Sequence, residues 1–590
     1  MAGLTTRYYS LSGGLNTTMG LGTINSSVRN TESPETYNVE PYKLSGLKSQ
    51  EGNKQIGQTL SAEVSLGHEY RKGSYKYLIV CTIDGKVWEF DRPTDSFVEI
   101  YQFPTATHRH SAVNFNQGVV ISNGIDDLIY YNHGRNTRLN GLVSITDGSN
   151  TVQGVGTSFT KEVAVGDIVT IDSESYEITE ITSDTVMEVS PVVSIEGGGT
   201  LTDLPYYLSP LSKLNAVYIN SDDATVNYPI RGLALNAYKG RLWVGANDGN
   251  LYYSEVGLIH GWDVKYGAGA IPPFYNDSSN FSPLGIYADY LIVHKQDYSY
   301  YISDTTDQGD FVVTPYTDHS CDSQQSWISC NNSYFIYSRK NGGIYPFMAR
   351  TAFINHYLGQ EISVKIRDDF RLLDDARSNE IFPVYHPIKK YLMFYMPMLQ
   401  GKGSNICYIY DFISKAWWLR KVPQEVTCAF AFNSDVYIGT ANGEILREFS
   451  TLTFNGEPIE FCWKSPWFQY GDGTSFLSTR EFRCKISEEY ANNFYVRNRR
   501  DGYDAFHQRN VNNDKDAFEA LVWSNDAGDI TETVWDDYDW VEVGYLIRRF
   551  PIPDQFFTSQ QIEFYGNVAN EAMCLLGFEL DRVEKEDASW

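Results

Sequence analysis

The sequence predicts a mostly β protein with several domains, and three observations support this prediction. Aromatic residues make up 15% of the 590 residues, including 43 Tyr and 12 Trp, and such large flat side chains favour strands over helices. Short apolar runs alternate with turns rich in Gly, Asn and Asp along most of the chain. The chain is also too long to fold around a single hydrophobic core, so roughly three or four domains are expected.

The opening segment, residues 1–65, combines small polar residues with scattered glycines. Neither helical nor strand periodicity can be written over it, most clearly between Ser12 and Gly57. Such a segment becomes ordered only where a partner supplies its contacts. We therefore expect an N-terminal extended arm and interface segment that binds another subunit and that the next domain does not need for folding.

A repeated hairpin unit follows from about residue 66. Each copy has an apolar strand, a tight turn and a strand carrying aromatics, with turns at Asp84-Gly85, Asn123-Gly124, Asp248-Gly249, Asp297, Asn341-Gly342 and Asn442-Gly443. Asp-Gly and Asn-Gly pairs favour two-residue hairpin turns, in which both central residues take positive φ. Their recurrence predicts a β-propeller of six or seven blades over residues 66–141 and 202–452.

Two segments interrupt this repeat. Residues 142–201 hold short Val, Ile and Thr strands without an aromatic hairpin and end in a glycine-rich exit, Glu196 to Thr200, which predicts an inserted small β-barrel. Further on, Ile366, Phe370 and Leu373 follow the spacing of an amphipathic helix. This is the best helix that the sequence predicts.

The final segment, residues 453–590, changes to longer alternating strands joined by polar connectors. This pattern predicts a separate C-terminal β-sandwich. Its expected core consists of Phe461, Trp463, Phe482, Phe494, Tyr545, Phe564 and Phe578.

The net charge of −27, from 47 Lys plus Arg and 74 Asp plus Glu, argues against an electrostatic grip on nucleic acid. The eight cysteines lie mostly in apolar strand-like runs, which favours buried free thiols over a disulfide framework. The start of the chain lacks the pattern of a signal peptide, and no apolar run has the length needed to cross a bilayer. We expect a protein made in a cytoplasm.

Sequence motifs of common enzymes are absent: there is no GxxxxGK[ST] phosphate loop, no HExxH, no GxSxG and no paired CxxC. We therefore predict no catalytic residues, no cofactor and no metal site, and no enzymatic activity. A glycan hydrolase remains an alternative, because propeller hydrolases use carboxylates that are far apart in sequence and this chain has many.

Two acidic stretches and one histidine pair also have structural interpretations. Asn525 to Asp529 offers alternating oxygen ligands for calcium, but an ordinary turn is favoured. The acidic aromatic run Trp535 to Trp540 is a recognition patch or, more simply, a solvated strand edge. His108 and His110 have close spacing for a metal, yet two histidines without a third ligand are usually polar loop residues.

A basic group near the C-terminus is the one candidate for contact with nucleic acid. It consists of Arg497, Arg499, Arg500 and Lys515, with Tyr and Phe nearby. In so acidic a chain this contact is not favoured.

Several segments resemble bacteriophage tail proteins. They are GGLNT at the start, the acidic ESPETYNV (Glu32 to Val39), LSGLKSQEG, WKSPWF (Trp463 to Phe468), STREFR (Ser478 to Arg483), LIRRFPI (Leu546 to Ile552) and LGFELD (Leu576 to Asp581). With a propeller between them, the chain is similar to the tail nozzle of short-tailed phages. The insertion at residues 142–201 is not a general feature of nozzles.

The resemblance implies a structural virion protein made in the host cytoplasm. It implies a homo-oligomer, a hexameric ring below the adaptor and portal complex and in contact with tail fibre proteins, enclosing a channel for genome ejection. Duplex DNA would pass through this lumen without specific binding, which agrees with the acidic composition. A glycan depolymerase and a receptor-binding propeller are the alternatives, and an enzyme would need converging carboxylates in a deep pocket.

Overall fold

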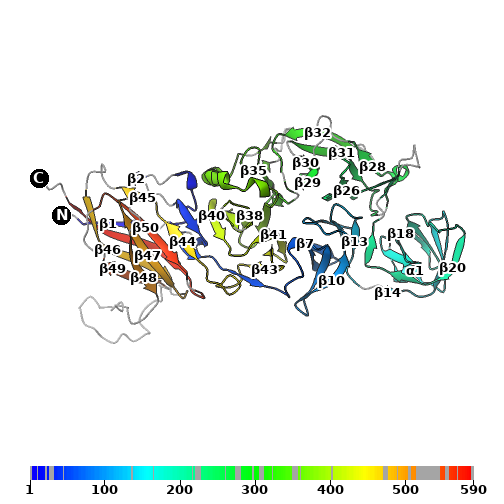
Figure 1. Ribbon diagram of the computed structural model, residues 1–590, viewed down its shortest axis with the longest axis horizontal. Helices are drawn as coiled ribbons and strands as arrows, with labels where there is room; N and C mark the ends of the chain where they lie inside the picture. The colour runs from blue at the N-terminus through cyan, green and yellow to red at the C-terminus, as the bar shows by residue number, and fades with distance from the viewer. Residues whose placement is uncertain are drawn as a thin grey trace, which may run out of the picture.

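The computed structural model describes most of the chain, and its elongated shape has three regions (Figure 1). The terminal sheets lie at one end, a ring of seven sheets lies in the middle, and an inserted sheet lies at the other end. The residues described are 3–8, 11–19, 23–25, 32–43, 45–134, 137–163, 165–214, 217–219, 227–259, 261–272, 281–295, 298–304, 311–321, 323, 325–348, 357–358, 360–399, 401, 403–469, 476–487, 489–501, 506–512, 545–551, 557–567 and 569–585.

The middle region consists of seven antiparallel sheets of four strands each, called blades 1 to 7 below. Blade 1 is β7 (Val64–Lys72), β8 (Tyr75–Thr82), β9 (Lys86–Asp91) and β10 (Ser96–Gln102). Blade 2 is β11 (Ser111–Phe115), β12 (Gly118–Ser122), β13 (Ile129–Tyr131) and β22 (Leu211–Lys213). Blade 3 is β25 (Ala234–Tyr238), β26 (Arg241–Gly245), β27 (Leu251–Tyr253) and β28 (Gly269–Ile271).

The remaining blades follow in chain order. Blade 4 is β29 (Phe281–Tyr287), β30 (Tyr290–Lys295), β31 (Ser299–Asp304) and β32 (Phe311–Thr317). Blade 5 is β33 (Trp327–Cys330), β34 (Ser333–Ser338), β35 (Gly343–Met348) and β36 (Tyr357–Leu358). Blade 6 is β37 (Phe382–His386), β38 (Tyr391–Met396), β39 (Ile406–Asp411) and β40 (Ala416–Lys421). Blade 7 is β41 (Val426–Phe432), β42 (Asp435–Thr440), β43 (Ile445–Glu448) and β6 (Asn53–Gln55).

The blades close into a ring, which is the arrangement of a β-propeller. The first strand of each blade contacts the first strand of the next, and β41 of blade 7 contacts β7 of blade 1. At this closure a Cβ on Gly67 would lie 2.1 Å from the ring of Phe430, so only glycine permits the approach of the two strands. The prediction of a mostly β chain with a propeller is therefore confirmed, with seven blades.

The fourth strand of blade 7 comes from the opening segment. β6 pairs with β43 in antiparallel register, with Asn53 opposite Glu448 and Gln55 opposite Leu446. The predicted independence of residues 1–65 from the propeller is wrong here, because β6 supplies the fourth strand of blade 7. β6 has the sequence Asn-Lys-Gln, which carries no apolar alternation that would mark it as a strand.

The turn predictions located the hairpins but assigned the wrong turn type. At Asp84-Gly85 only the glycine has positive φ, and Gly85 N–H donates to the Thr82 carbonyl at 2.9 Å across a three-residue loop. Gly249, Gly342 and Gly443 repeat this geometry. Two-residue turns with two positive φ values instead join the first and second strands of blades, at Asn116-Gln117, Ala288-Asp289, Asn331-Asn332 and Asn433-Ser434. Asp297 lies outside the described residues.

The predicted amphipathic helix is a 3-10 helix, η3 (Val364–Leu372). Its hydrogen bonds span three residues, as in Ile366 N–H to the Ser363 carbonyl at 2.9 Å. Ile366, Phe370 and Leu373 are buried against blades 5 and 6, as their spacing predicted. Shorter 3-10 turns are η1 (Thr17–Met19), η2 (Val264–Tyr266) and η4 (Asp375–Arg377).

The insertion between β13 and β22 forms one eight-stranded antiparallel sheet around its own hydrophobic cluster. Its elements are β14 (Thr137–Arg138), β15 (Leu142–Thr146), β16 (Thr151–Val155), α1 (Phe159–Glu162), β17 (Ile168–Ile171), β18 (Glu174–Ser183), β19 (Val186–Ser190), β20 (Thr200–Leu204) and β21 (Tyr206–Leu208). It is wider than the predicted residues 142–201. A two-stranded sheet, β23 (Val217–Ile219) with β24 (Asn227–Pro229), follows it.

The region at the other end, called the terminal module, contains strands from both ends of the chain. One sheet has β4 (Val39–Tyr42), β5 (Gly46–Ser49), β51 (Cys574–Lys585), β46 (Phe476–Ser487) and β49 (Tyr545–Pro551) in that order, and β1 (Gly3–Tyr8) also pairs with β51. The other sheet contains β2 (Thr23–Asn25), β45 (Trp467–Gln469), β50 (Ser559–Gly566), β44 (Phe461–Lys464), β3 (Glu35–Tyr37), β47 (Asn493–Arg500) and β48 (Phe506–Asn512).

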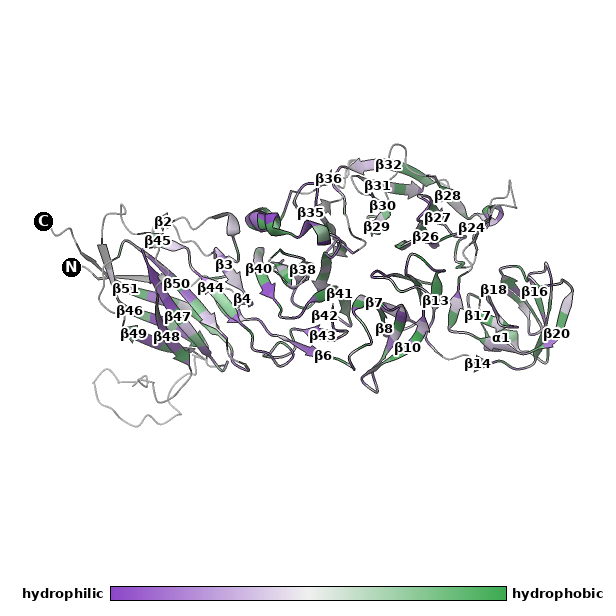
Figure 2. Cartoon of the chain, viewed as in Figure 1, coloured by the Kyte–Doolittle hydropathy of each residue, from purple (hydrophilic) through white to green (hydrophobic). Residues whose placement is uncertain are grey.

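One hydrophobic cluster joins the terminal module to blades 6 and 7. It includes six of the seven predicted core residues, which are at most 2% exposed: Phe461, Trp463, Phe482, Phe494, Phe564 and Phe578. The seventh prediction is wrong, because Tyr545 is only partly buried and its ring lies 3.5 Å from Lys485 Nζ. Hydrophilic and hydrophobic residues alternate along these strands (Figure 2), and the shared cluster replaces the separate C-terminal domain that the sequence predicted.

Candidate functional site

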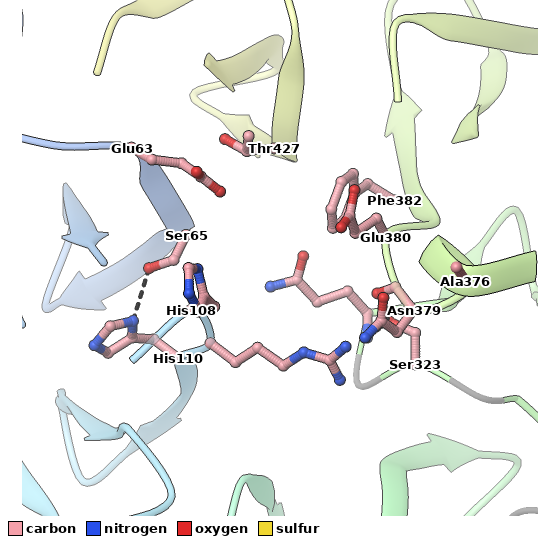
Figure 3. A pocket seen from close by; sticks show the side chains of 12 residues that line it. Glu63, Ser65, His108, His110, Ser323, Ala376, Asn379, Glu380, Phe382 and Thr427 are labelled. Carbon is pink, nitrogen blue, oxygen red and sulfur yellow. Dashed lines mark hydrogen bonds between the residues drawn. The ribbon is translucent and has the colours of Figure 1, made fainter. Parts of the chain in front are cut away.

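A cavity of about 310 Å³ opens where the first strands of five blades begin (Figure 3). Glu63 and Ser65 come from the start of β7, and the loop 108–110 leads directly into β11. Blade 5 contributes Ser323 and Gln325, and blade 7 contributes Thr427. The segment leading into blade 6 contributes Ala376, Asn379, Glu380 and Phe382. Because these residues precede or begin first strands, the fold gathers them at one mouth of the ring.

The predicted histidine pair divides between two environments. His110 is 1% exposed, and its Nδ1 lies 2.7 Å from Ser65 Oγ. Burial lowers the pKa of His110 to about 4, so this imidazole is neutral at pH 7. His108 is exposed and lines the cavity. Within the described part of the chain, no group of three or more His, Cys, Asp or Glu is placed to hold a metal.

The Ser65 and His110 contact also lacks the third group of a hydrolytic triad. In such triads another side chain orients the base through its second ring nitrogen. His110 Nε2 is buried without a hydrogen-bond partner, and Ser65 Oγ also lies 3.1 Å from the Cys81 carbonyl oxygen. We therefore interpret this contact as a structural hydrogen bond of a neutral histidine in the wall of the cavity.

Two carboxylates face the cavity from opposite sides (Figure 3). Burial raises the pKa of Glu63, nearby His108 opposes this shift, and Glu380 and Glu425 add to it. Glu380 Oε2 accepts from Arg377 Nε at 2.7 Å, and Arg377 Nη2 also reaches Glu425 Oε1 at 3.1 Å. Arg377 thus offsets the charge on the Glu380 side, while the Glu63 side chain has no hydrogen bond to the described residues.

Arg109 is the cation of the cavity without an ion pair among the described residues. Burial lowers the pKa of its guanidinium, and Glu380 partly compensates. The amides of Gln325 and Asn379 also line the cavity and have no side-chain hydrogen bond within the same described set. The backbone of Asn379 is fixed instead, since its carbonyl accepts from Ser323 Oγ at 2.8 Å.

Sequence reasoning identified the two histidines here and missed Glu63, Arg109, Gln325 and Asn379. The usable signal was positional, because each lies one to three residues before the first strand of a blade. Aligning the hairpin repeats on their first strands would have placed these residues around one mouth of the ring.

The basic group near the C-terminus turns inward rather than toward solvent. Arg497 Nη1 and Arg499 Nη2 lie 3.2 and 3.0 Å from the two oxygens of Glu563, which is 3% exposed. Arg500 is buried over the ring of Phe557, and burial lowers its pKa. These three cations therefore pair with or pack against the sheet. Lys515, Asn525 to Asp529 and Trp535 to Trp540 lie outside the described residues.

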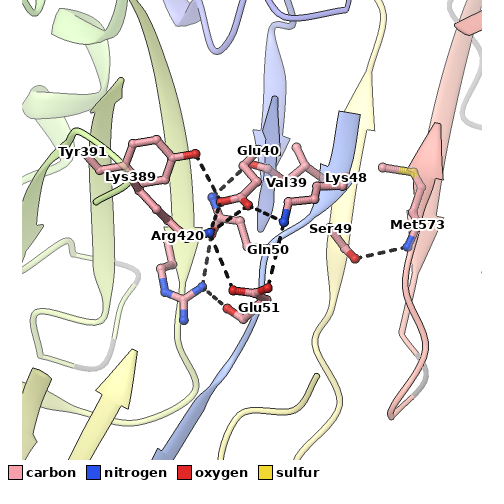
Figure 4. Close-up of polar contacts among 10 residues, drawn as sticks. All are labelled: Val39, Glu40, Lys48, Ser49, Gln50, Glu51, Lys389, Tyr391, Arg420 and Met573. Carbon is pink, nitrogen blue, oxygen red and sulfur yellow. Dashed lines mark hydrogen bonds and ion pairs between the residues drawn. The ribbon is translucent and has the colours of Figure 1, made fainter. Parts of the chain in front are cut away.

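A polar cluster connects the terminal module to blade 6 (Figure 4). Glu40 is 2% exposed; Lys389 Nζ lies 2.9 Å and Lys48 Nζ 3.0 Å from Glu40 Oε1, and Tyr391 donates to Oε2 at 3.2 Å. Burial alone raises the pKa of Glu40, but the two lysines lower it by more, so the net shift is downward. This carboxylate is therefore held in its charged form.

A second buried pair lies beside the first. Arg420 and Glu448 are both fully buried and form an ion pair, and Arg420 Nη1 donates to the Glu51 carbonyl at 2.8 Å. Asn53 of β6 donates to Glu448 Oε1 at 3.2 Å. The ring closure and the terminal module thus share one charged network.

The eight cysteines are all free and buried, which confirms the prediction from their sequence context. Among the helices of the described residues, none is long and apolar enough to span a bilayer.

No protein-family model and no curated protein matches the chain. The chain is similar to solved structures that include the computationally designed Ika8 protein (11% identity, 68% of this chain and 100% of that chain, TM-score 0.34). Others are the WD40 β-propeller domain of Doa1 (10% identity, 67% and 95%, TM-score 0.31) and YCF48 from Cyanidioschyzon merolae (10% identity, 67% and 98%, TM-score 0.35). These low scores add no weight, so the class of the fold, a seven-bladed propeller, rests on strand order and ring closure.

Proposed function

We propose that this chain is a structural virion protein, the tail nozzle of a short-tailed bacteriophage. Six copies form a ring below the adaptor and portal complex, contact the tail fibre proteins and enclose the channel through which the genome is ejected. The chain has no enzymatic role in this proposal and is located in the tail of the virion.

One observation carries the proposal: the segments that resemble tail proteins are distant in sequence but adjacent in space. The acidic segment contributes β3, which pairs with β44, where the WKSPWF segment begins. The STREFR segment lies in β46, which pairs with β49 and β51, the strands of the LIRRFPI and LGFELD segments. The resemblance thus follows one structural unit, the terminal module, rather than scattered matches.

The GGLNT segment supports the same interpretation, because it docks on blade 6. Gly14 has φ +78° and its missing Cβ would lie 2.4 Å from the Trp417 carbonyl oxygen, so this position requires glycine. Leu15 N–H donates to that carbonyl at 2.6 Å, and its side chain is 2% exposed. Gly14 and Leu15 of this short motif therefore have structural roles at the junction between the terminal module and the propeller.

The charge of the chain suits a conduit for DNA. Each phosphate that a Lys or Arg neutralises releases counterions and adds affinity, so a lumen rich in free cations would retain the genome. The net charge is −27, and two of the three arginines of the C-terminal basic group are paired with Glu563. We expect the lumen to have a negative potential that repels the duplex over a Debye length of about 8 Å at physiological salt.

The finer architecture belongs to this proposal. We assign the inserted eight-stranded sheet to a small β-barrel and the two sheets of the terminal module to a β-sandwich. In the ring, the terminal module would supply the contacts between neighbouring subunits, since both chain ends lie there (Figure 1).

The copy number and position of the chain in virus particles test the proposal. Quantitative mass spectrometry of purified particles should give six copies of the 67.0 kDa chain per particle, and antibodies against it should label the far end of the tail in electron micrographs. Labelling of the head, or absence of the chain from purified particles, would contradict a nozzle.

Binding to DNA provides a second test. The purified full-length chain should not retard a 20-base-pair duplex in a gel at 50 mM salt, because low salt strengthens any phosphate contact. Micromolar binding that weakens steeply as salt rises would show a cationic surface and contradict a passive conduit.

A further inference from the structure

The cavity at the mouth of the propeller holds polar side chains that the fold itself does not use. Glu63, His108, Arg109, Gln325 and Asn379 line it, and none of these side chains has a hydrogen bond or ion pair with the described part of the chain. Four of the five are half-buried and His108 is exposed, so their polar groups are open to water or to a ligand. Five uncommitted side chains from four blades around one cavity of about 310 Å³ therefore indicate a ligand site.

The charges around the cavity identify one group of the ligand. Arg377 is already bound to Glu380 and Glu425, which leaves Arg109 as the guanidinium available to an incoming molecule. A guanidinium presents a planar set of donors that fits a carboxylate in bidentate fashion. His108 stands on the same loop and adds a further ring nitrogen on that side.

The remaining side chains identify the rest of the ligand. The amides of Gln325 and Asn379 each offer donors and an acceptor, a combination that suits hydroxyl groups. Burial raises the pKa of Glu63, and its carboxyl group lines the same cavity. Phe382 supplies an aromatic wall for an apolar face. The volume lies at the lower end of small-molecule sites, which limits the occupant to about one ring.

We propose that this cavity binds one sugar unit that carries a carboxylate, a uronic acid, with the carboxylate on Arg109 and the ring hydroxyls on Asn379 and Gln325. The unit is either a free sugar acid or the end of an acidic polysaccharide. The proposal concerns binding only and does not depend on the assembly of a ring.

Titration of the full-length chain with D-glucuronate, followed by ligand-observed NMR, tests this assignment. D-Glucose is the matched control ligand, because it has the same ring with a hydroxymethyl group in place of the carboxylate. Glucuronate should bind about tenfold or more tightly than glucose, the factor expected for hydrogen bonds to a charged group. A disaccharide that ends in glucuronate separates the two sources: equal or tighter binding assigns the polysaccharide end, and binding of the monosaccharide alone assigns the free acid.

Arg109→Gln should weaken glucuronate binding by about tenfold or more and leave the weak glucose binding unchanged. Arg371→Gln is the control variant, because Arg371 lies on η3 with its side chain 80% exposed and pairs with Asp368. Asn379→Ala is a second variant, which should weaken both sugars by severalfold and keeps the proposal testable if Arg109→Gln fails to fold. Equal affinity for the two sugars, no binding of either at 20 mM, or unchanged affinity in both cavity variants would overturn the proposal.

Discussion

The insertion and the terminal module are both β regions attached to the propeller, but they are built in opposite ways. The insertion is one continuous segment, and its two ends meet where Asn132 N–H donates to the Pro210 carbonyl at 2.7 Å. The terminal module combines strands that begin at Gly3 with strands that end at Lys585. The insertion is a local unit attached to blade 2, whereas the terminal module pairs strands from the two ends of the chain. We therefore expect removal of strands from the terminal module to cost more free energy of unfolding than removal of the insertion.

The largest expected effect comes from deleting residues 1–57. The deletion removes β6 from blade 7 and β1 to β5 from the terminal module. We expect a loss of about 5 kcal/mol or more, comparable with the whole stability of a domain, so that no cooperative thermal transition remains. Circular dichroism and the soluble yield measure this. A truncated chain with the melting temperature of the full chain would show that blade 7 is stable without β6. It would contradict a larger contribution of the terminal strands to stability.

Breaking the buried pair at the closure should have the next largest effect. Arg420→Met leaves Glu448 buried without its cation and should lower the free energy of unfolding by about 3–5 kcal/mol in urea titrations. Arg447→Met is the control, because Arg447 pairs with Asp435 at 2.8 Å on the surface and should cost less than about 1 kcal/mol. The double variant Arg420→Met with Glu448→Leu should recover most of the loss. Equal effects of the two single variants would contradict a special role for the closure.

The charged junction at Glu40 should make stability depend on pH. Because the pKa of Glu40 is lowered in the fold, its stabilising effect is present above the unfolded value near 4.5 and is lost as the pH falls through the folded value. Glu40→Gln should cost about 2–3 kcal/mol at pH 7, the range for hydrogen bonds to charged groups, and much less at pH 3.

Thermal unfolding at the two pH values measures this difference. Glu35→Gln is the control, since Glu35 pairs with Lys464 at 2.5 Å with half of its side chain exposed. The prediction fails where the Glu40→Gln penalty is as large at pH 3 as at pH 7.

The smallest expected effect comes from removing the insertion. Replacing residues 137–208 with a short Gly-Ser linker keeps β13 and β22 paired, because the ends already meet. The propeller loses contacts with Ile168 and the hydrogen bond from Ile259 N–H to Glu177 Oε2 at 2.9 Å. A cost of at most about 2 kcal/mol follows from burial of roughly one side chain. Unfolding of the shortened chain would show instead that the propeller needs the insertion for its stability.

Local signals explain how much of this fold the sequence could predict. The hairpins of the propeller were visible because aromatic strands and Gly-containing turns are encoded within about 20 residues, although the number of blades, six or seven, was not. β6 was not visible, since three polar residues become a strand only when β43 supplies a partner nearly the whole propeller later. The same limit applies to the shared core of the terminal module, where β5 meets β51 only in the folded chain.

The candidate site shows the same division. His108 and His110 were candidates because they are close in sequence. In the structure His110 is buried in the wall of the cavity and His108 is exposed at the cavity. Glu63, Arg109 and Asn379 carried no local signal, because residues from four blades meet only after the ring closes. A cavity formed by strand beginnings can be predicted only once the repeat is aligned.

The pairing of β6 with β43 also determines when blade 7 can fold during synthesis. β6 leaves the ribosome early, and its partner β43 follows only about 390 residues later. At about 5–20 residues per second, the waiting time is roughly 20–80 s. Through that interval the growing chain holds an open arc of blades with an unpaired sheet edge, the kind of surface that pairs with other nascent chains. Chaperones that cover this edge, or slow initiation that keeps nascent chains apart, should therefore raise the yield of folded protein.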